Sequence, residues 1–240
     1  MLEKILHYEH DFFLQLNSFH STFWDQFMWL FSGKIAWMPA VAFFVTVLLF
    51  KNWHRWKEIL LIFVAITLVA TLCDQFASGF CKSFFERLRP THHPDFMDKV
   101  HTVFDYRGGR YGFISSHAAN AFGFATLTSL IFKYRFYSIT IFGWATVNSY
   151  SRIYLGVHFI SDIVPGIITG LFLGWLIFVL YLFIYKKAFA GSIKGDSCEK
   201  YPYRYEGLNA IIFMLLLIIT VITVLSLLYC FNITPAITAK

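Results

Sequence analysis

Charged side chains are scarce in this chain of 240 residues. Asp, Glu, Lys and Arg make up 14% of the sequence, apolar residues make up 58%, and the mean hydropathy is +0.59. A soluble domain carries about 25% charged residues because they cover its surface. The composition therefore excludes a protein that is wetted on all sides and indicates a protein of the lipid bilayer. It also excludes a disordered chain and a nucleic-acid-binding module, despite a net charge of +6.

Cysteine is also rare, and no Cys-x-x-Cys pair occurs. The spacing indicates neither a disulfide framework nor a metal knuckle. We predict thiols without a structural role at Cys73, Cys81, Cys198 and Cys230. The first eleven residues mix acidic, basic and histidine side chains and lack the apolar core and cleavage site of a signal peptide, so we expect none.

Long apolar runs, by contrast, are abundant. A helix needs about 20 mostly apolar residues to cross the hydrocarbon core. About six membrane helices are predicted, at roughly residues 34–50, 58–80, 117–132, 136–153, 158–185 and 208–231. Polar residues interrupt the apolar segment 12–31, which could span or lie in the interface, and we expect an interfacial N-terminal helix. The sequence thus predicts an all-α polytopic membrane helix bundle that forms a single domain over residues 1–240.

Basic residues are concentrated in the connections at one end of these helices. The connections are 51–57, 133–135 and 186–206, and their cations are Lys51, Arg55, Lys57, Lys133, Arg135, Lys186, Lys187, Lys194, Lys200 and Arg204. An excess of Lys and Arg marks the cytoplasmic face. We therefore expect the polar loop at 86–116 and the turn near 152–158 on the extracytoplasmic face.

The first of three polar clusters lies at the outer end of the second predicted span. Lys82 and Arg89 are seven residues apart, or two helical turns, and Pro90 ends the helix after them. The spacing predicts two cations that point toward one place. We interpret Arg87, which is off this line, as a side chain that extends toward lipid headgroups. Asp74, inside the second predicted span, shares a helix face with Lys82. Either an ion pair with a cation of this cluster or a structural hydrogen bond to a neighbouring helix would explain a carboxylate at this position.

The second cluster is Ile114-Ser115-Ser116-His117, at the start of the third predicted span. Serines just before an apolar helix are N-cap candidates, and the free N–H groups of a helix N-terminus favour an anion. His117 is then expected beside the bound anion.

The third cluster is Ser151-Arg152, followed by His158 and Asp162. The i,i+4 spacing of the last two predicts imidazole and carboxylate on one helix face. An Asp bonded to one ring nitrogen fixes the tautomer and makes the other nitrogen a better nucleophile.

Together the clusters supply three cations, a helix N-terminus, a His–Asp pair and a second His. Phosphate monoester chemistry requires such a set, because charge on the phosphoryl oxygens must be neutralised, a nucleophile must attack in line and an acid must protonate the departing oxygen. This scheme needs no metal and no cofactor.

The motifs Lys82-x6-Arg89-Pro90, Ser115-Ser116-His117 and Ser151-Arg152-x5-His158-x3-Asp162 resemble the three-part signature of the type 2 phosphatidic acid phosphatase superfamily. The resemblance covers roughly residues 82–162. That family includes membrane lipid phosphatases, isoprenyl diphosphate phosphatases and bacterial lipid A phosphatases, and its site is related to that of vanadium haloperoxidases. Its usual Pro-Ser-Gly-His reads Ile-Ser-Ser-His here, so serine replaces a glycine that tolerates positive φ.

The resemblance implies a role for each matching residue. His158 attacks phosphorus to form a phosphohistidine, Asp162 orients and activates it, and His117 protonates the leaving lipid oxygen. The implied phosphate-binding groups are Lys82, Arg89, Ser115, the backbone of Ser116 and Arg152. The outer loop also holds potential metal ligands without a repeated spacing, which we interpret as solvated; these are His92, His93, Asp95 and His101.

We expect an enzyme that hydrolyses a phosphate from a lipid, with lipid A phosphates and undecaprenyl diphosphate as leading substrates. Phosphatidylglycerol phosphate or phosphatidic acid is the alternative, and transfer of a phosphate-bearing group between lipids stays open. A transporter is disfavoured because the polar residues gather at one end and no second symmetric half is visible. The expected location is a bacterial cytoplasmic membrane, with the site facing the periplasm or outside. The expected partners are the phosphorylated lipid and the bilayer, without nucleic acid; the oligomeric state stays open.

Overall fold

The computed structural model describes residues 2–95, 97–189 and 205–238, and every regular element in these ranges is a helix. The α-helices are α1 (Leu2–Ser18), α2 (Thr22–Ser32), α3 (Lys34–Lys51), α4 (Trp56–Asp74), α5 (Lys82–Phe85), α6 (Ser116–Phe132), α7 (Arg135–Tyr154), α8 (Ile160–Phe189) and α9 (Leu208–Thr238). Short 3-10 turns are η1 (Trp53–Arg55), η3 (Pro90–His92) and η4 (Val103–Asp105), and a π-helical segment, η2 (Gln75–Cys81), joins α4 to α5. The all-α prediction is confirmed.

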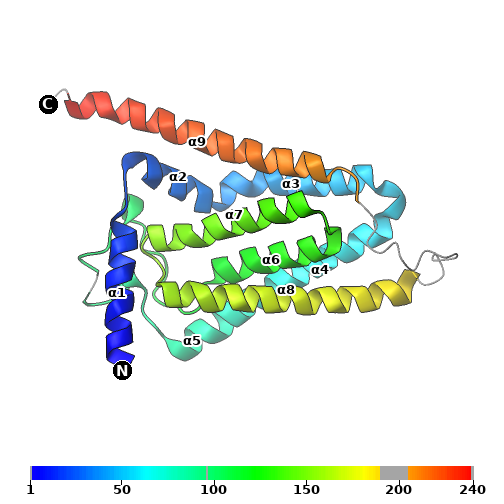
Figure 1. Ribbon diagram of the computed structural model, residues 1–240, viewed down its shortest axis with the longest axis horizontal. Helices are drawn as coiled ribbons and strands as arrows, with labels where there is room; N and C mark the ends of the chain where they lie inside the picture. The colour runs from blue at the N-terminus through cyan, green and yellow to red at the C-terminus, as the bar shows by residue number, and fades with distance from the viewer. Residues whose placement is uncertain (1, 96, 190–204, 239–240) are drawn as a thin grey trace.

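Helix α6 lies at the centre of the bundle and packs against α4, α7 and α8 (Figure 1). Its contact with α8 is close because glycines recur every fourth residue on the facing side of α8. A Cβ at Gly166, Gly170 or Gly174 would lie 2.7, 2.4 or 2.7 Å from a carbonyl oxygen of the α6 segment. The start of α8 is therefore held against the start of α6, which brings the second and third motifs together.

Four helical stretches are long and apolar enough to cross a membrane. They are Lys34–Lys51, Trp53–Phe85, Ile160–Ala188 and Leu208–Asn232. Large apolar side chains on these helices face outward, as Phe50 does at 80% exposure, which suits contact with lipid. The protein is thus a multi-pass membrane protein.

The other two predicted spans also form helices but differ from these four. Helix α6 has 17 residues, and α7 carries polar side chains that include the buried Asn148 and Ser149. By length and composition alone, four of the six predicted membrane helices are thus supported.

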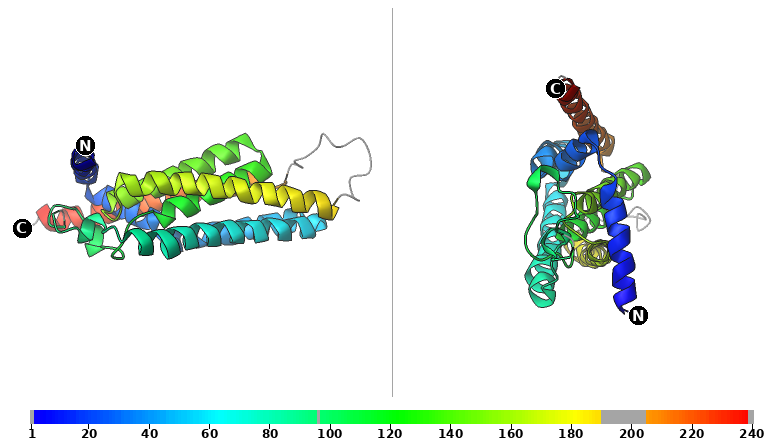
Figure 2. Two further views of the ribbon diagram at one scale, coloured as in Figure 1. Left: turned by 90° about the horizontal axis from the view of Figure 1, so that it is seen from below. Right: turned by 90° about the vertical axis from the view of Figure 1, so that its left-hand side faces the viewer.

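The N-terminal segment is not the single interfacial helix predicted over 12–31. Helix α1 ends at Ser18 and α2 begins at Thr22, where the Oγ of Ser21 accepts a hydrogen bond from the Trp24 N–H (3.3 Å). The chain changes direction at this cap: α1 lies across the end of the bundle, whereas α2 runs along it beside α9 (Figure 1). Figure 2 shows α1 nearly end-on in one view and lengthwise in the other.

The described basic connections all lie at the end of the bundle opposite to α1 (Figure 1). This end holds the turn from α3 to α4, the turn from α6 to α7 and the end of α8. Lys194, Lys200, Arg204 and Cys198 lie outside the described residues. Cys73 and Cys81 are buried free thiols.

Candidate active site

The first motif does not form the predicted two-turn helix through Arg89. The helix ends at Phe85, because Glu86 adopts a left-handed φ of 46° and its N–H donates to the carbonyl of Lys82 (3.1 Å). The chain then turns back, and the N–H of Arg89 donates to the carbonyl of Arg110 (3.1 Å). Lys82 and Arg89 therefore reach the site from a helix and from an extended segment.

Backbone carbonyls hold the buried guanidinium of Arg89 in place. Its Nε donates to the carbonyl of Tyr111 (3.0 Å), and its Nη1 donates to that of Val157 (3.4 Å). Gly108, at a φ of +68°, leaves room for this group, because a Cβ there would lie 2.6 Å from Nη1. Burial lowers the pKa of Arg89, and the positive charge of Arg152 lowers it further. A bound anion would offset this crowding of positive charge.

Lys82 joins the first motif to the second. Its Nζ donates to the Oγ of Ser116 (3.3 Å) and to the Oγ of Ser78 (3.0 Å). The Ser78 hydroxyl in turn donates to Asp74 Oδ1 (3.3 Å). Of the two explanations for Asp74, the structure gives an indirect link to a cation of the site, through Ser78.

The second motif forms the predicted N-cap. The Oγ of Ser115 accepts a hydrogen bond from the Ala118 N–H (3.4 Å), and Ser116 is the first residue of α6. Ser116 has helical backbone and not a positive φ, so the position does not require the usual glycine. His117, in the first turn, lines two cavities of about 850 and about 770 Å³.

The third motif brings His158 and Asp162 together in a fully buried pair. The Nδ1 of His158 lies 3.4 Å from Oδ2 of Asp162, which also accepts the N–H of Phe159 (3.0 Å). The two residues do not share a helix face as predicted, because α8 begins at Ile160 and His158 lies in the preceding turn. The carbonyl of Asp162 accepts the Ser115 N–H (3.0 Å), so the pair is tied to the start of α6.

The Nε2 atom of His158 is buried and has no hydrogen-bond partner in the part of the chain that the structure describes. Burial lowers the pKa of His158 well below its usual value, and the charges of Arg89 and Arg152 lower it further. The imidazole is therefore neutral at pH 7. With Nδ1 turned toward the carboxylate, Nε2 carries a lone pair that is available to attack an electrophile.

Arg152 completes the group of cations whose charges act on His158. It is 3% exposed, and its Nη2 donates to the hydroxyl of Tyr106 (3.3 Å). Tyr106, Arg152 and His117 line the larger of the two cavities. Sequence reasoning did not identify Tyr106, because a single aromatic residue in a long loop carries no motif.

The interpretation of Arg87 as a headgroup contact is wrong. Its Nη1 donates to Asp162 Oδ1 (3.1 Å) and contacts the hydroxyl of Ser161, and its Nη2 donates to Glu9 Oε2 (3.1 Å). The turn at Glu86 directs this side chain toward the start of α8. No sequence pattern predicts a contact with Glu9, which lies 78 residues away.

One cluster among the described residues offers three ligand atoms that a metal could use. Atoms of His20, Asp25 and His101 lie within 4.8 Å of one another. The two imidazole rings stack with centroids 3.7 Å apart and an angle of 6° between their planes, so their lone pairs lie in two separate, nearly parallel planes and a ring would have to turn for both to point at one ion. Asp25 accepts the Tyr154 hydroxyl (2.7 Å) and lies 3.4 Å from His101 Nε2, so the interpretation of His101 as solvated is wrong.

The sequence of this chain is similar to those of a known family and of two named phosphatases. A family model described as "PAP2 superfamily" matches residues 60–186. A protein of Porphyromonas gingivalis named "Lipid A 4'-phosphatase" is 43% identical over 201 residues, which is 84% of this chain and 82% of that protein. A protein of Bacteroides thetaiotaomicron with the same name is 42% identical over 181 residues, or 75% of this chain and 80% of that protein.

Two crystal structures resemble the fold. LpxE of Aquifex aeolicus is 25% identical, with a TM-score of 0.52 over 70% of this chain and 92% of that chain. A PAP2-type phosphatidylglycerolphosphate phosphatase of Bacillus subtilis is 20% identical, with a TM-score of 0.50 over 80% of this chain and 89% of that chain. The second likeness concerns the fold alone.

Proposed function

Because the chain belongs to the PAP2 superfamily, we propose that it hydrolyses a phosphate from lipid A, with the 4'-phosphate as its target. The family predicted from the three motifs is confirmed. The observation that carries the proposal is the buried Nε2 of His158, which has no hydrogen-bond partner among the described residues. Asp162 contacts the Nδ1 atom of the same ring, and the charges of Arg89, Arg152 and Lys82 act on it. We prefer the 4'-phosphate of lipid A to undecaprenyl diphosphate as the substrate because both relatives are named for it.

The proposed reaction has two steps. In the first, the lone pair of His158 Nε2 forms a bond to phosphorus, the bond from phosphorus to the lipid oxygen breaks, and His117 gives that oxygen a proton. In the second, water forms a bond to phosphorus, the nitrogen–phosphorus bond breaks, and His117 takes a proton from the water. Asp162 stabilises the positive charge on the imidazole ring in both steps.

The phosphate is held by groups that contact one another across the three motifs. Lys82, Arg89 and Arg152 neutralise its oxygens, and the capped start of α6 at Ser115 and Ser116 provides backbone N–H groups. These donors stabilise the extra negative charge of the transition state.

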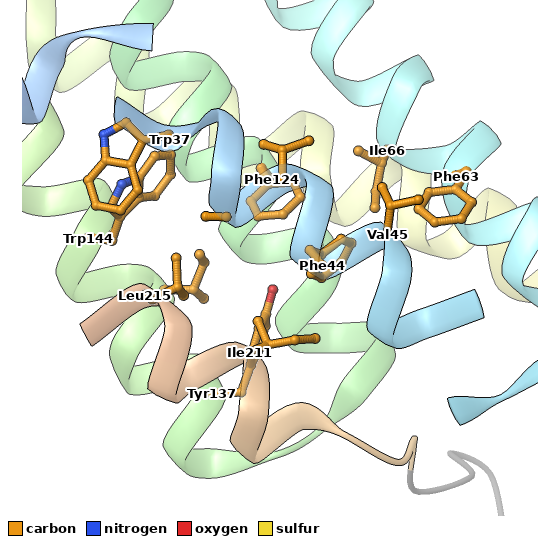
Figure 3. Close-up of a pocket in the computed structure, with 13 residues that line it drawn as sticks. Trp37, Phe44, Val45, Phe63, Ile66, Phe124, Tyr137, Trp144, Ile211 and Leu215 are labelled. Carbon is orange, nitrogen blue, oxygen red and sulfur yellow. The ribbon is translucent and has the colours of Figure 1, made fainter. Parts of the chain in front are cut away.

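The cavities around His117 suit a lipid. The cavity of about 850 Å³ extends from Arg152 and His117 along apolar side chains of α3 and α9. The cavity of about 770 Å³ shares Trp37, Val41, Phe124 and Trp144 with a third one of about 320 Å³, which is lined by apolar and aromatic side chains of α3, α4, α6, α7 and α9 (Figure 3). Acyl chains could occupy this apolar space while the phosphate lies at its polar end.

The proposal includes a place in the cell. We expect α6 and α7 to cross the membrane together with the four longer stretches, since both are packed inside the bundle. The basic connections then face the cytoplasm, and the site faces the periplasm of a bacterial cell. We also propose that residues 1–240 act as one domain, because the motifs and the N-terminal helix meet at one end.

A panel of phosphorylated lipids tests the substrate. Purified protein in detergent is given bisphosphorylated lipid A, undecaprenyl diphosphate, phosphatidylglycerol phosphate or phosphatidic acid, and free inorganic phosphate is measured. We expect kcat/KM for lipid A to exceed the others by at least about tenfold, which corresponds to about 1.4 kcal/mol of transition-state binding. Mass spectrometry is expected to show loss of the 4'-phosphate. Equal rates on all four lipids, or transfer to another lipid without free phosphate, would contradict the proposal.

Removal of divalent metal ions is expected to leave the rate unchanged, within about twofold, because Lys82, Arg89 and Arg152 supply the positive charge that a metal would otherwise provide. The measurement is phosphate release after treatment with EDTA, beside a zinc-dependent phosphatase in the same detergent as a control for chelation. Loss of activity that zinc or magnesium restores would count against this mechanism.

A further inference from the structure

We propose that Glu9 and Arg87 are positioning residues that hold Asp162, and through it His158, in the reactive geometry. This inference rests on the proposed phosphatase function. It adds to the site a carboxylate from α1, which lies outside the matched family region 60–186.

The two oxygens of the Asp162 carboxylate have different partners. Oδ2 faces His158 Nδ1 and accepts the Phe159 N–H, whereas Oδ1 accepts from Nη1 of Arg87 (3.1 Å). Asp162 is 0% exposed, so no bulk water replaces a lost partner. Without Arg87, the carboxylate could rotate and turn Oδ2 away from the imidazole.

Further contacts hold both the side chain and the backbone of Arg87. The guanidinium lies 4.7 Å from the centre of the Phe159 ring, and the backbone carbonyl of Arg87 accepts the Gly112 N–H (2.8 Å). The side chain is 25% exposed, so it is neither a buried core residue nor a freely solvated one. A flexible arginine in this place would need a further contact to hold one orientation.

Glu9 provides that contact and binds α8 at the same time. Its Oε2 accepts from Nη2 of Arg87 (3.1 Å), and its Oε1 accepts the backbone N–H of Ser161 (2.8 Å). Ser161 is the second residue of α8, so Glu9 satisfies one of the free N–H groups at that helix N-terminus. One carboxylate, 13% exposed, therefore fixes both the arginine and the helix that carries Asp162.

Apolar contacts hold α1 in the place that this arrangement needs. The ring of Phe13, on the same helix as Glu9, packs edge-on against Phe159 with centroids 5.2 Å apart. Phe13 is 0% exposed. The α1 helix is thus packed directly beside the turn that carries His158.

The test is steady-state kinetics of phosphate release from lipid A by the purified full-length protein. We expect Glu9→Ala to lower kcat on the order of tenfold, with KM changed by less than about twofold, because the phosphate-binding cations stay in place. Glu9→Gln keeps a carbonyl for the Ser161 N–H but loses the charge that faces Arg87, so it is expected to lose kcat as well. Gln15→Ala, at an exposed position of the same helix, is the matched control and is expected to keep the wild-type rate.

A double-mutant cycle separates positioning from a general effect on stability. If Glu9 acts largely through Arg87, the variant with Glu9→Ala and Arg87→Ala loses less kcat than the product of the two single losses, because only the contact of Glu9 with the Ser161 N–H is left to lose once Arg87 is gone. Multiplied losses, a wild-type kcat for Glu9→Ala, or a Glu9→Gln variant with the wild-type rate would each overturn the inference. If wild-type protein and Gln15→Ala release no phosphate from lipid A, the proposed function fails instead. Melting temperatures in detergent identify a variant that is slow because it unfolds.

Discussion

Replacing His158 with alanine is expected to abolish phosphate release and to leave the protein folded. The substitution removes the only atom to which the proposed mechanism transfers the phosphoryl group. We expect a loss in kcat on the order of 10⁴-fold or more, as for the removal of other nucleophiles. The fold should persist, because Nε2 makes no hydrogen bond to the described residues and the surrounding helices are held by contacts elsewhere.

Two measurements check this expectation. The first is phosphate release from lipid A, with His54→Ala as the control, since His54 is exposed in the connection between α3 and α4 at the other end of the bundle. The second is an acid-labile phosphoprotein, trapped by rapid quenching of the wild type and absent from the variant. Release of phosphate at the wild-type rate by His158→Ala would refute the assignment of the nucleophile.

Replacing Asp162 with asparagine is expected to cost on the order of 10³ to 10⁴-fold in kcat, because a neutral amide neither fixes the imidazole tautomer nor stabilises the imidazolium. The substitution also leaves Arg87 without its anionic partner on α8. KM is expected to change little, since Lys82, Arg89 and Arg152 still bind the phosphate.

The matched control for this substitution is Asp98→Asn, which removes the same charge from an exposed position of the outer loop. Both variants are compared with the wild type in kcat, KM and melting temperature. A loss below about tenfold for Asp162→Asn would show that the carboxylate does not orient the nucleophile.

The parts of the site that could be predicted from the sequence are those with short-range causes. The cap at Ser115 follows from serine before an apolar helix. The contact of His158 with Asp162 joins residues that are only four apart, although the turn before α8 makes it and not the predicted helix face. The long apolar runs predicted the membrane helices for the same reason, because the transfer of an apolar segment into lipid depends little on the rest of the chain.

The errors arose where distant or weakly encoded contacts decide the structure. The left-handed turn at Glu86 uses an ordinary residue, so nothing in the sequence marks the end of the helix before Arg87. The partner of that arginine, Glu9, comes from another helix. The break between α1 and α2 depends on the cap at Ser21, one of several polar residues in the segment.

The glycines of α8 affect the geometry of the site, although some of them lie several turns away along the bundle. Because Gly166, Gly170 and Gly174 bring the backbones of α6 and α8 into direct contact, the two helices have almost no freedom to slide or separate. The distance between the proposed proton donor, His117 in α6, and the proposed nucleophile, His158 just before α8, is thereby set by atoms several turns away. A larger side chain at Gly170 would force α6 and α8 apart. A substitution in the middle of the membrane could therefore abolish activity while all three motifs stay unchanged.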